Sequence, residues 1–191
     1  PGFDEFNGEL PVGWTSRRLN EPGVSGKMHR LSPGRDGTGS GLELEPTTPI
    51  TNISLKSPAF AVSGRGDYLF KGYYASTCEG VPPDKGQVNA AGVRLSGNWL
   101  DAEEKNVGSF TIVLPETQDR WVECFQEVRS PAAAQALQIV ITRGQVDGRL
   151  RFDDFSLRPG GIREYEEEFS SPQVPNEDFF PIFGWLTPGN P

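Results

Sequence analysis

Short stretches of alternating hydrophobic and polar residues recur along the chain, and such alternation is typical of strands with one buried face. The clearest alternation is in 88–96, around Val93 and Leu95, while 67–77 is rich in aromatic residues and 109–114 in β-branched residues. The full set of predicted strands is 41–45, 53–61, 67–77, 88–96, 109–114, 121–128, 137–142 and 149–157. Turn-forming clusters of Gly, Pro, Asp and Ser separate several of them. The pattern predicts an all-β fold, an antiparallel β-sandwich.

The succession of strand-like stretches and turns ends at about Pro159. Residues 161–191 contain six acidic residues and one basic residue, and they include the apolar run 179–186. We therefore predict two parts. Residues 1–160 form the sandwich domain, and residues 161–191 form an acidic linker with either the start of a following domain or a packed C-terminal tail.

Composition narrows the possible partners. The formal net charge of the 191 residues is -8 and no basic stripe is present, so we expect neither nucleic acid nor a membrane surface as a partner. A single histidine, His29, excludes a Cys/His zinc cluster. Two cysteines, Cys78 and Cys124, allow either one disulfide or two buried thiols.

Several landmarks follow one another in a recognisable order. They are GFD at 2–4, LPVGW at 10–14, a glycine-rich loop at 37–41, Trp121, and RFDDFSL at 151–157. This succession resembles the galactose-binding-like jelly rolls, and among them the carbohydrate-binding modules of families 4, 9 and 22. The resemblance covers roughly residues 2–158. It implies a jelly-roll module that binds a polysaccharide or oligosaccharide and is not itself an enzyme.

The run 178–186 resembles the opening strand of a (β/α)8 glycoside hydrolase, where FFPIG commonly follows such a module. This resemblance implies an attached catalytic domain, in a polysaccharide-degrading enzyme that is secreted or periplasmic. The alternative is a C-terminal segment that packs on the sandwich.

Asp153 and Asp154 predict a metal site. Neighbouring strand residues face opposite sides, so one carboxylate must point inward or to a sheet edge, where an unpaired charge is costly. A hard cation with oxygen ligands would remove that cost. In the resembling modules a structural calcium joins an N-terminal acid, the glycine-rich loop and one acid of the terminal pair. Carried over, these are Asp4, a loop near 36–40, and Asp153 or Asp154. Capping by backbone amides is the alternative.

Sugar binding requires flat aromatic side chains flanked by polar groups. Trp14, Tyr68 and Trp121 match core landmarks of the resembling fold, so we assign them to packing. Trp99 lies in the polar stretch 96–101, which predicts an exposed ring on a turn, although it could also cover a sandwich edge. The candidate ligand-binding residues are Trp99, one of Tyr73 and Tyr74, and the polar side chains Arg94 and Gln126.

Three functions compete at this point. A non-catalytic glycan-binding module is favoured, and a ligand-free module that braces a glycoside hydrolase is the first alternative. The second alternative is a jelly-roll polysaccharide hydrolase or lyase, for which Glu123 and Glu127 on one strand face are the available carboxylates.

Overall fold

A computed structural model describes residues 3, 5–8, 10–17, 28–45, 53–78, 92–144 and 146–160. These residues form strands and turns, and none of them belongs to a helix that could span a membrane. The strands are β1 (Phe6–Asn7), β2 (Leu10–Pro11), β3 (Thr15–Arg17), β4 (Met28–Leu31), β5 (Gly41–Leu44), β6 (Ile53–Ala61), β7 (Asp67–Ser76), β8 (Val93–Leu100), β9 (Asn106–Leu114), β10 (Val122–Arg129), β11 (Ala136–Arg143) and β12 (Leu150–Pro159).

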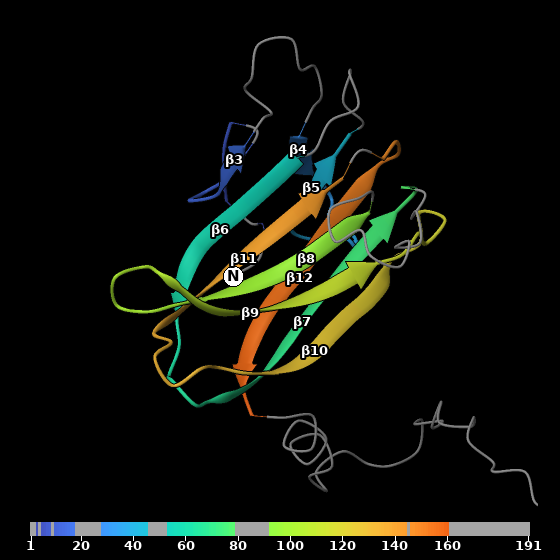
Figure 1. Ribbon diagram of the computed structural model, residues 1–191. Coiled ribbons are helices and arrows are strands. Elements are labelled where there is room, and N and C mark those ends of the chain that lie inside the picture. Colours follow the sequence, from blue (N-terminus) through green and yellow to red (C-terminus); the bar gives the residue numbers. More distant parts are fainter. Residues whose placement is uncertain are drawn as a thin grey trace, which may run out of the picture.

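The strands build two five-stranded sheets that face each other (Figure 1). The β7 sheet has the order β10-β7-β12-β5-β4, and the β11 sheet has the order β3-β6-β11-β8-β9. Every pair within them is antiparallel, and β1 and β2 add a separate two-stranded ribbon. The fold is the predicted all-β antiparallel sandwich, a jelly roll.

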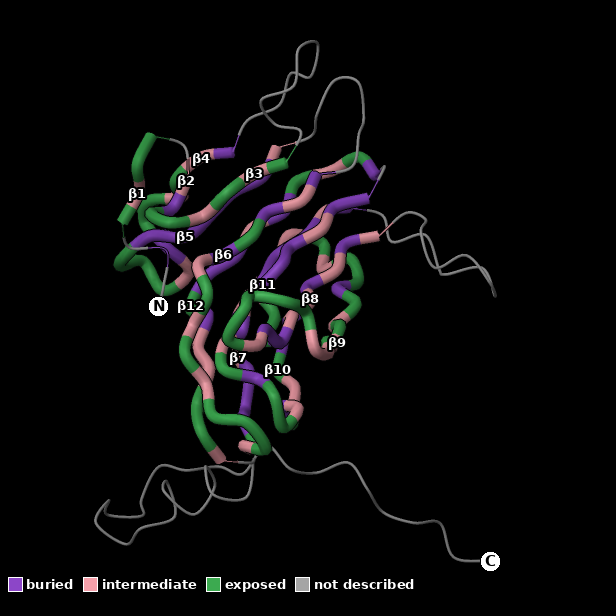
Figure 2. Tube along the Cα trace, turned by 60° about the vertical axis from the view of Figure 1, so that its left-hand side comes forward, coloured by how far each residue is buried: buried purple, intermediate pink, exposed green. Residues whose placement is uncertain are grey.

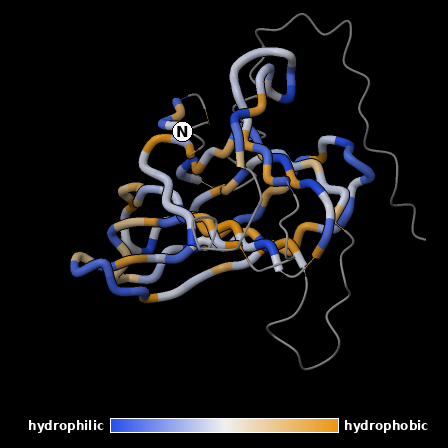
Figure 3. Tube along the Cα trace, turned by 90° about the horizontal axis from the view of Figure 1, so that it is seen from above, coloured by the Kyte–Doolittle hydropathy of each residue, from blue (hydrophilic) through white to orange (hydrophobic). Residues whose placement is uncertain are grey.

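Alternating side chains build the core between the two sheets. On β7, Tyr68, Phe70 and Tyr74 are buried, whereas Lys71 and Tyr73 are partly exposed on the opposite side. The tube in Figure 2 shows this change between buried and more exposed positions along the strands. Seen from above, hydrophobic and hydrophilic residues alternate along several strands, and several outlying loops are hydrophilic (Figure 3). The period of two observed in the sequence therefore decides which side chains reach solvent.

The predicted strand 88–96 ends four residues too early, because β8 runs from Val93 to Leu100. Residues 88–91 lie outside the described residues. The stretch 96–101, expected to be a polar turn, is mostly strand. The actual turn comes later, where the Asp101 carboxylate accepts hydrogen bonds from the backbone N–H groups of Glu103 and Lys105, each 2.9 Å long. Every second residue of β8 from Val93 onward points into the core, and this alternation continues to Trp99.

Trp99 is consequently a core residue, and the prediction of an exposed sugar-stacking ring is wrong. Its side chain is 2% exposed, and its ring centroid lies 6.0 Å from those of Tyr68 and Phe110. Gly97 is also inward, and a β-carbon there would lie 2.1 Å from the Phe110 ring. Gly97 thus leaves room for an aromatic ring, which explains a glycine inside a strand.

The two cysteines are free buried thiols. Cys124 pairs with Gly72 on β7, whereas Cys78 lies six residues further along, or about 20 Å for extended chain. This separation is far beyond the reach of a disulfide.

Candidate functional site

Tyr73 lies on the outer face of the β7 sheet, on the strand next to the edge strand β10. It lies between Glu123 on β10 and Asp153 on β12, each opposite it in the register. The Tyr73 hydroxyl donates a 2.8 Å hydrogen bond to Glu123 Oε1, and the same carboxylate forms an ion pair with Lys71. The Arg35 guanidinium covers one face of the ring, with Cζ 3.9 Å from the ring centroid. Four side chains thus hold one another in place on this face.

These contacts shift the ionisation of both acidic groups. The hydrogen bond to Glu123 and partial burial raise the pKa of the Tyr73 phenol. Desolvation opposes the charge on Glu123, but hydrogen bonds from Lys71 and Tyr73 outweigh it and lower the pKa of this carboxyl. At neutral pH the cluster therefore presents a phenol that donates, a carboxylate that accepts and two cations.

Trp121 extends the same face. Val122 pairs with Tyr74, so Trp121 comes next to Ala75 on β7. Ala75 is two residues from Tyr73, a spacing of about 7 Å along the strand. Its ring is partly exposed, and the Arg151 guanidinium lies 5.2 Å from the ring centroid. The prediction that Trp121 packs in the core is wrong, because its side chain points outward from the β7 sheet.

A carboxylate fixes Arg151, the cation beside Trp121. Asp119 forms ion pairs with Arg149 and Arg151, each with an N···O distance of 2.6 Å. Arg151 also donates a 3.0 Å hydrogen bond to the backbone carbonyl of Asp119. Trp121 is thereby flanked by polar groups whose positions are set before any ligand arrives.

Phe125 supplies a third aromatic side chain. It is 54% exposed and lies two residues beyond Glu123 on β10, so both share the outer face. The series Trp121, Glu123, Phe125 has a period of two, interleaved with Val122 and the buried Cys124. This alternation is the sequence signal that would have identified the face.

The other predicted ligand-binding residues do not join Tyr73. Tyr74 is 3% exposed and lies in the core, so only the outward member of the tyrosine pair remains a candidate. Arg94 faces away from the core, as expected, beside the 61% exposed Val113, but it belongs to the β11 sheet. Gln126 pairs with Phe70, so it points to the inter-sheet side at an edge strand, and its predicted outward direction is wrong.

The loop 32–40, which joins β4 to β5, closes over Asp153. Asp153 is 6% exposed, and its carboxylate accepts 2.8 Å hydrogen bonds from the backbone N–H groups of Arg35 and Asp154. A β-carbon on Gly34 would lie 2.6 Å from Asp153 Oδ2, so the loop backbone rests directly on the carboxylate. Burial raises the pKa of Asp153, although the two backbone hydrogen bonds oppose this shift.

Asp154 faces solvent at the β12 irregularity. Its φ is 53°, in the left-handed region, and the pairing of β12 with β7 shifts between Asp153 and Ser156. The Asp154 carboxylate forms a 2.9 Å ion pair with Arg35. One aspartate of the pair is therefore buried and the other exposed, but the loop buries Asp153 on the outer face of the sheet, and its side chain does not point between the sheets or to a sheet edge as predicted. Asp4, the third predicted metal ligand, lies outside the described residues.

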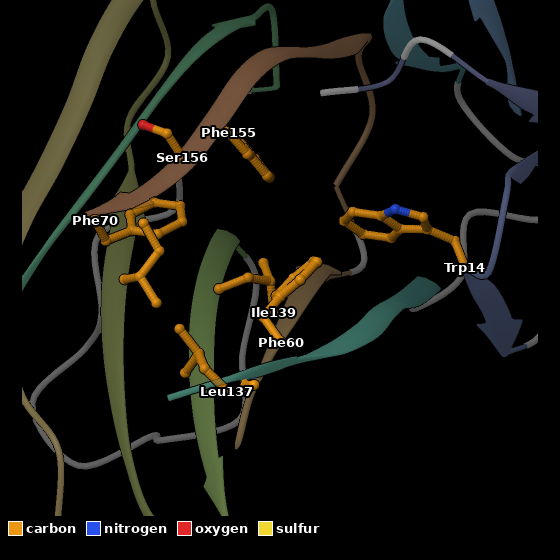
Figure 4. A pocket seen from close by; sticks show the side chains of 9 residues that line it. Trp14, Phe60, Phe70, Leu137, Ile139, Phe155 and Ser156 are labelled. Carbon is orange, nitrogen blue, oxygen red and sulfur yellow. The ribbon is translucent and has the colours of Figure 1, made fainter. Parts of the chain in front are cut away.

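A separate apolar cavity lies between the sheets (Figure 4). Its volume is about 120 Å³. The lining residues are Trp14, Phe60, Ala61, Phe70, Leu137, Ile139, Phe155, Ser156 and Leu157. Trp14 packs here against Phe3, with ring centroids 5.4 Å apart, which agrees with its predicted packing role. Because this lining offers few hydrogen-bonding groups, the cavity does not suit a sugar.

Comparisons with known proteins support the fold at low sequence identity. No family model matches the chain, and no curated protein matches it. The enzymatically active domain of bacteriophage CBA120 tailspike protein 4 has a TM-score of 0.58 at 14% identity, over 80% of this chain and 20% of that one. The CBM22-1 and GH10 modules of Clostridium thermocellum xylanase 10B, complexed with xylohexaose, have a TM-score of 0.51 at 17% identity, over 78% and 26%.

This chain therefore spans only about a fifth to a quarter of those two proteins. The CBM22-1 xylan-binding domain of Paenibacillus barcinonensis Xyn10C matches at nearly full length. It has a TM-score of 0.52 at 15% identity, over 83% of this chain and 90% of that domain. Two facing antiparallel sheets with this strand order give the chain the jelly-roll fold of the carbohydrate-binding modules.

Proposed function

We propose that this domain is a non-catalytic carbohydrate-binding module that binds a polysaccharide or oligosaccharide on the outer face of its β7 sheet. One observation carries the proposal. Trp121, Tyr73 and Phe125 lie on that one face, among ion-paired polar side chains. Aromatic rings stack on the C–H surfaces of sugars, and fixed polar groups hydrogen-bond to hydroxyls.

The geometry favours binding over catalysis. Glu123 and Glu127 are four residues apart on one strand, so their Cα atoms are about 13 Å apart. Glycoside hydrolysis needs carboxylates about 5 to 9.5 Å apart across the bond that is cleaved. Glu123 is also engaged by Lys71 and Tyr73. These two residues therefore make a poor catalytic pair.

The exposed aromatic residues also favour glycan binding over a ligand-free brace. A module that only supports a neighbouring hydrolase domain needs no aromatic side chains on an open sheet face, yet Phe125 is 54% exposed. The fold neighbours add support, since one is described as a xylan-binding domain. We propose further that the parent protein is a secreted polysaccharide-degrading enzyme. The module would raise the effective concentration of its catalytic domain on the glycan.

Affinity electrophoresis in gels containing neutral polysaccharides, xylan included, tests the proposal. We expect the domain to be retarded by at least one of them, and Tyr73→Ala and Trp121→Ala each to weaken binding roughly tenfold. Val113→Ala, an exposed residue on the β11 sheet, is the matched control and should bind as the unmodified domain does. Absence of retardation on every glycan would overturn the proposal.

A structural calcium ion at Asp153 is a second element of the proposal. The carboxylate is buried, and no described Lys, Arg or His forms an ion pair with it. Two backbone N–H groups cap this carboxylate, as in the alternative interpretation of the sequence, and the Thr38 carbonyl oxygen lies beside Gly34. Carboxylate and carbonyl oxygens are the ligands that a hard cation takes. When bound, calcium would neutralise the buried charge and fix the loop. Asp4 is the additional ligand that the family resemblance implies.

Chelation tests this element. Calcium that binds only the folded state raises the melting temperature by mass action, so a chelator should lower it and added calcium should restore it. An unchanged melting temperature in both directions would exclude the site.

A further inference from the structure

Three potential metal ligands converge at the β4 edge of the β7 sheet, away from Asp153. His29 on β4 lies directly opposite Glu43 on β5, so their side chains share the outer face. Glu45 is two residues beyond Glu43 and points to the same side. The ligand atoms of these three side chains all lie within 4.8 Å of one another. Strand pairing, rather than chance proximity of flexible loops, brings them together.

The three side chains differ in exposure in a way that suits a metal site. The Glu43 side chain is 11% exposed and forms the floor, whereas those of His29 and Glu45 are 38% and 43% exposed. The backbone carbonyl of Glu45 accepts a 2.7 Å hydrogen bond from the fully buried Arg143, which fixes the end of the strand. The cluster therefore has a rigid base and an open side where water can complete the coordination.

Two carboxylates meet here with little positive charge to balance them. Among the described residues, His29 is the one basic side chain within ion-pair distance of Glu43 or Glu45. Arg151 lies opposite Glu43 on β12, but its guanidinium binds Asp119 instead. A divalent cation would compensate both carboxylates at once.

One of the ligand spacings matches zinc coordination. Zinc binds imidazole nitrogen and carboxylate oxygen at about 2.0–2.2 Å, so two ligand atoms around a tetrahedral ion lie roughly 3.2–3.5 Å apart. His29 Nε2 lies 3.2 Å from Glu43 Oε1 and 4.0 Å from Glu45 Oε1. The first spacing already fits. The second would have to shorten by roughly 0.5–0.8 Å, and the spacing between the Glu43 and Glu45 carboxylates, which is within 4.8 Å, would have to reach the same range.

We propose that His29, Glu43 and Glu45 form a binding site for a first-row divalent transition-metal ion of the zinc class. The imidazole nitrogen distinguishes this site from the all-oxygen site at Asp153, because calcium and magnesium take oxygen ligands. The proposal does not depend on glycan binding or on calcium at Asp153.

Isothermal titration calorimetry with zinc chloride, in buffer that contains excess calcium, tests the site. We expect one zinc ion per chain and a higher melting temperature with zinc. His29→Ala should weaken zinc binding by at least tenfold and should abolish the zinc-dependent shift in melting temperature. The isosteric Glu43→Gln should also weaken binding tenfold or more, and it retains the size of the partly buried side chain.

Glu103→Gln is the matched control, because Glu103 is a 71% exposed carboxylate paired with Lys105 on a distant turn. This variant should bind zinc as the unmodified chain does. Melting temperatures without zinc show whether each variant is folded. Two results would overturn the proposal: no heat of zinc binding to the unmodified chain, or unchanged affinity in folded His29→Ala and Glu43→Gln. In either case the cluster would be an ion pair only.

Discussion

Arg35 links two parts of the molecule, because its guanidinium carbon lies 3.9 Å from the ring centroid of Tyr73 while its backbone N–H binds Asp153. The side chain also forms the ion pair with Asp154. The loop that covers the buried carboxylate therefore positions the cation that covers the Tyr73 ring. The proposed calcium site and the proposed glycan face share this one residue.

The first prediction concerns that link. Arg35→Ala should weaken glycan binding severalfold, because Tyr73 loses the cation on its ring, an interaction worth about 0.5–1 kcal/mol at such sites. Isothermal titration with the glycan identified by electrophoresis measures the effect. Chelation of the unmodified domain should weaken binding in the same direction. Unchanged affinity in both experiments would mean that the loop and the glycan face act independently.

The second prediction concerns Trp99. Trp99→Ala should lower the free energy of unfolding by about 3–5 kcal/mol, because it removes a ring that is 2% exposed and leaves a cavity. Urea denaturation measures the change. Val113→Ala, at a 61% exposed position, should change stability by no more than about 0.5 kcal/mol. A Trp99 variant as stable as the unmodified domain would contradict the core position.

The third prediction uses the raised pKa of Asp153. A carboxyl whose pKa is higher in the folded state binds more protons there, so its contribution to stability falls as pH rises. Without calcium, the stability of the domain relative to Asp153→Asn should fall as pH increases from the ordinary aspartate value of 3.8 through the raised value. Denaturation at a series of pH values measures this difference.

Calcium should reduce that pH dependence, because a bound cation favours the ionised carboxylate. If the difference between the two proteins instead grows with pH, the carboxylate is stabilised rather than destabilised by its surroundings.

The fourth prediction concerns the thiols. Burial raises the pKa of Cys78, and it raises that of Cys124 to about 11. Neither thiol should therefore react with a thiol reagent in the folded domain, and both should react once it is unfolded in denaturant. A reducing agent should leave the melting temperature unchanged. A clear loss of stability on reduction would show that a disulfide is present.

Period-two alternation was enough to predict most of the fold. The strand 53–61 was placed at its observed bounds, and its first half shows the alternation of apolar Ile53 and Leu55 with polar Ser54 and Lys56. The short strands β1 to β4 were missed, since two to four residues carry too little pattern. Trp99 was misplaced because Ser96, Gly97 and Asn98 have the composition of a turn. The reason for a glycine there, the Phe110 ring, lies on another strand.

The candidate site was less predictable, since it depends on strand register. Tyr73 was identified, but its contact with Arg35 requires the loop over Asp153 to be in place. Trp121 was assigned to the core from its place in the order of landmarks, although its alternation with Glu123 and Phe125 was visible. The pairing of His29 with Glu43 joins residues from two strands, and no local pattern indicates it.

The position of β10 at the border of the β7 sheet has a consequence for how this protein can change over time. Trp121 immediately precedes β10 and Phe125 lies within it. Because β10 has β7 as its single hydrogen-bonded neighbour, replacing these two side chains perturbs little of the sandwich. Selection can therefore vary these side chains and retarget the surface to a new ligand while the core remains intact. A library randomised at these two positions is the natural starting point for engineering new specificities from this scaffold.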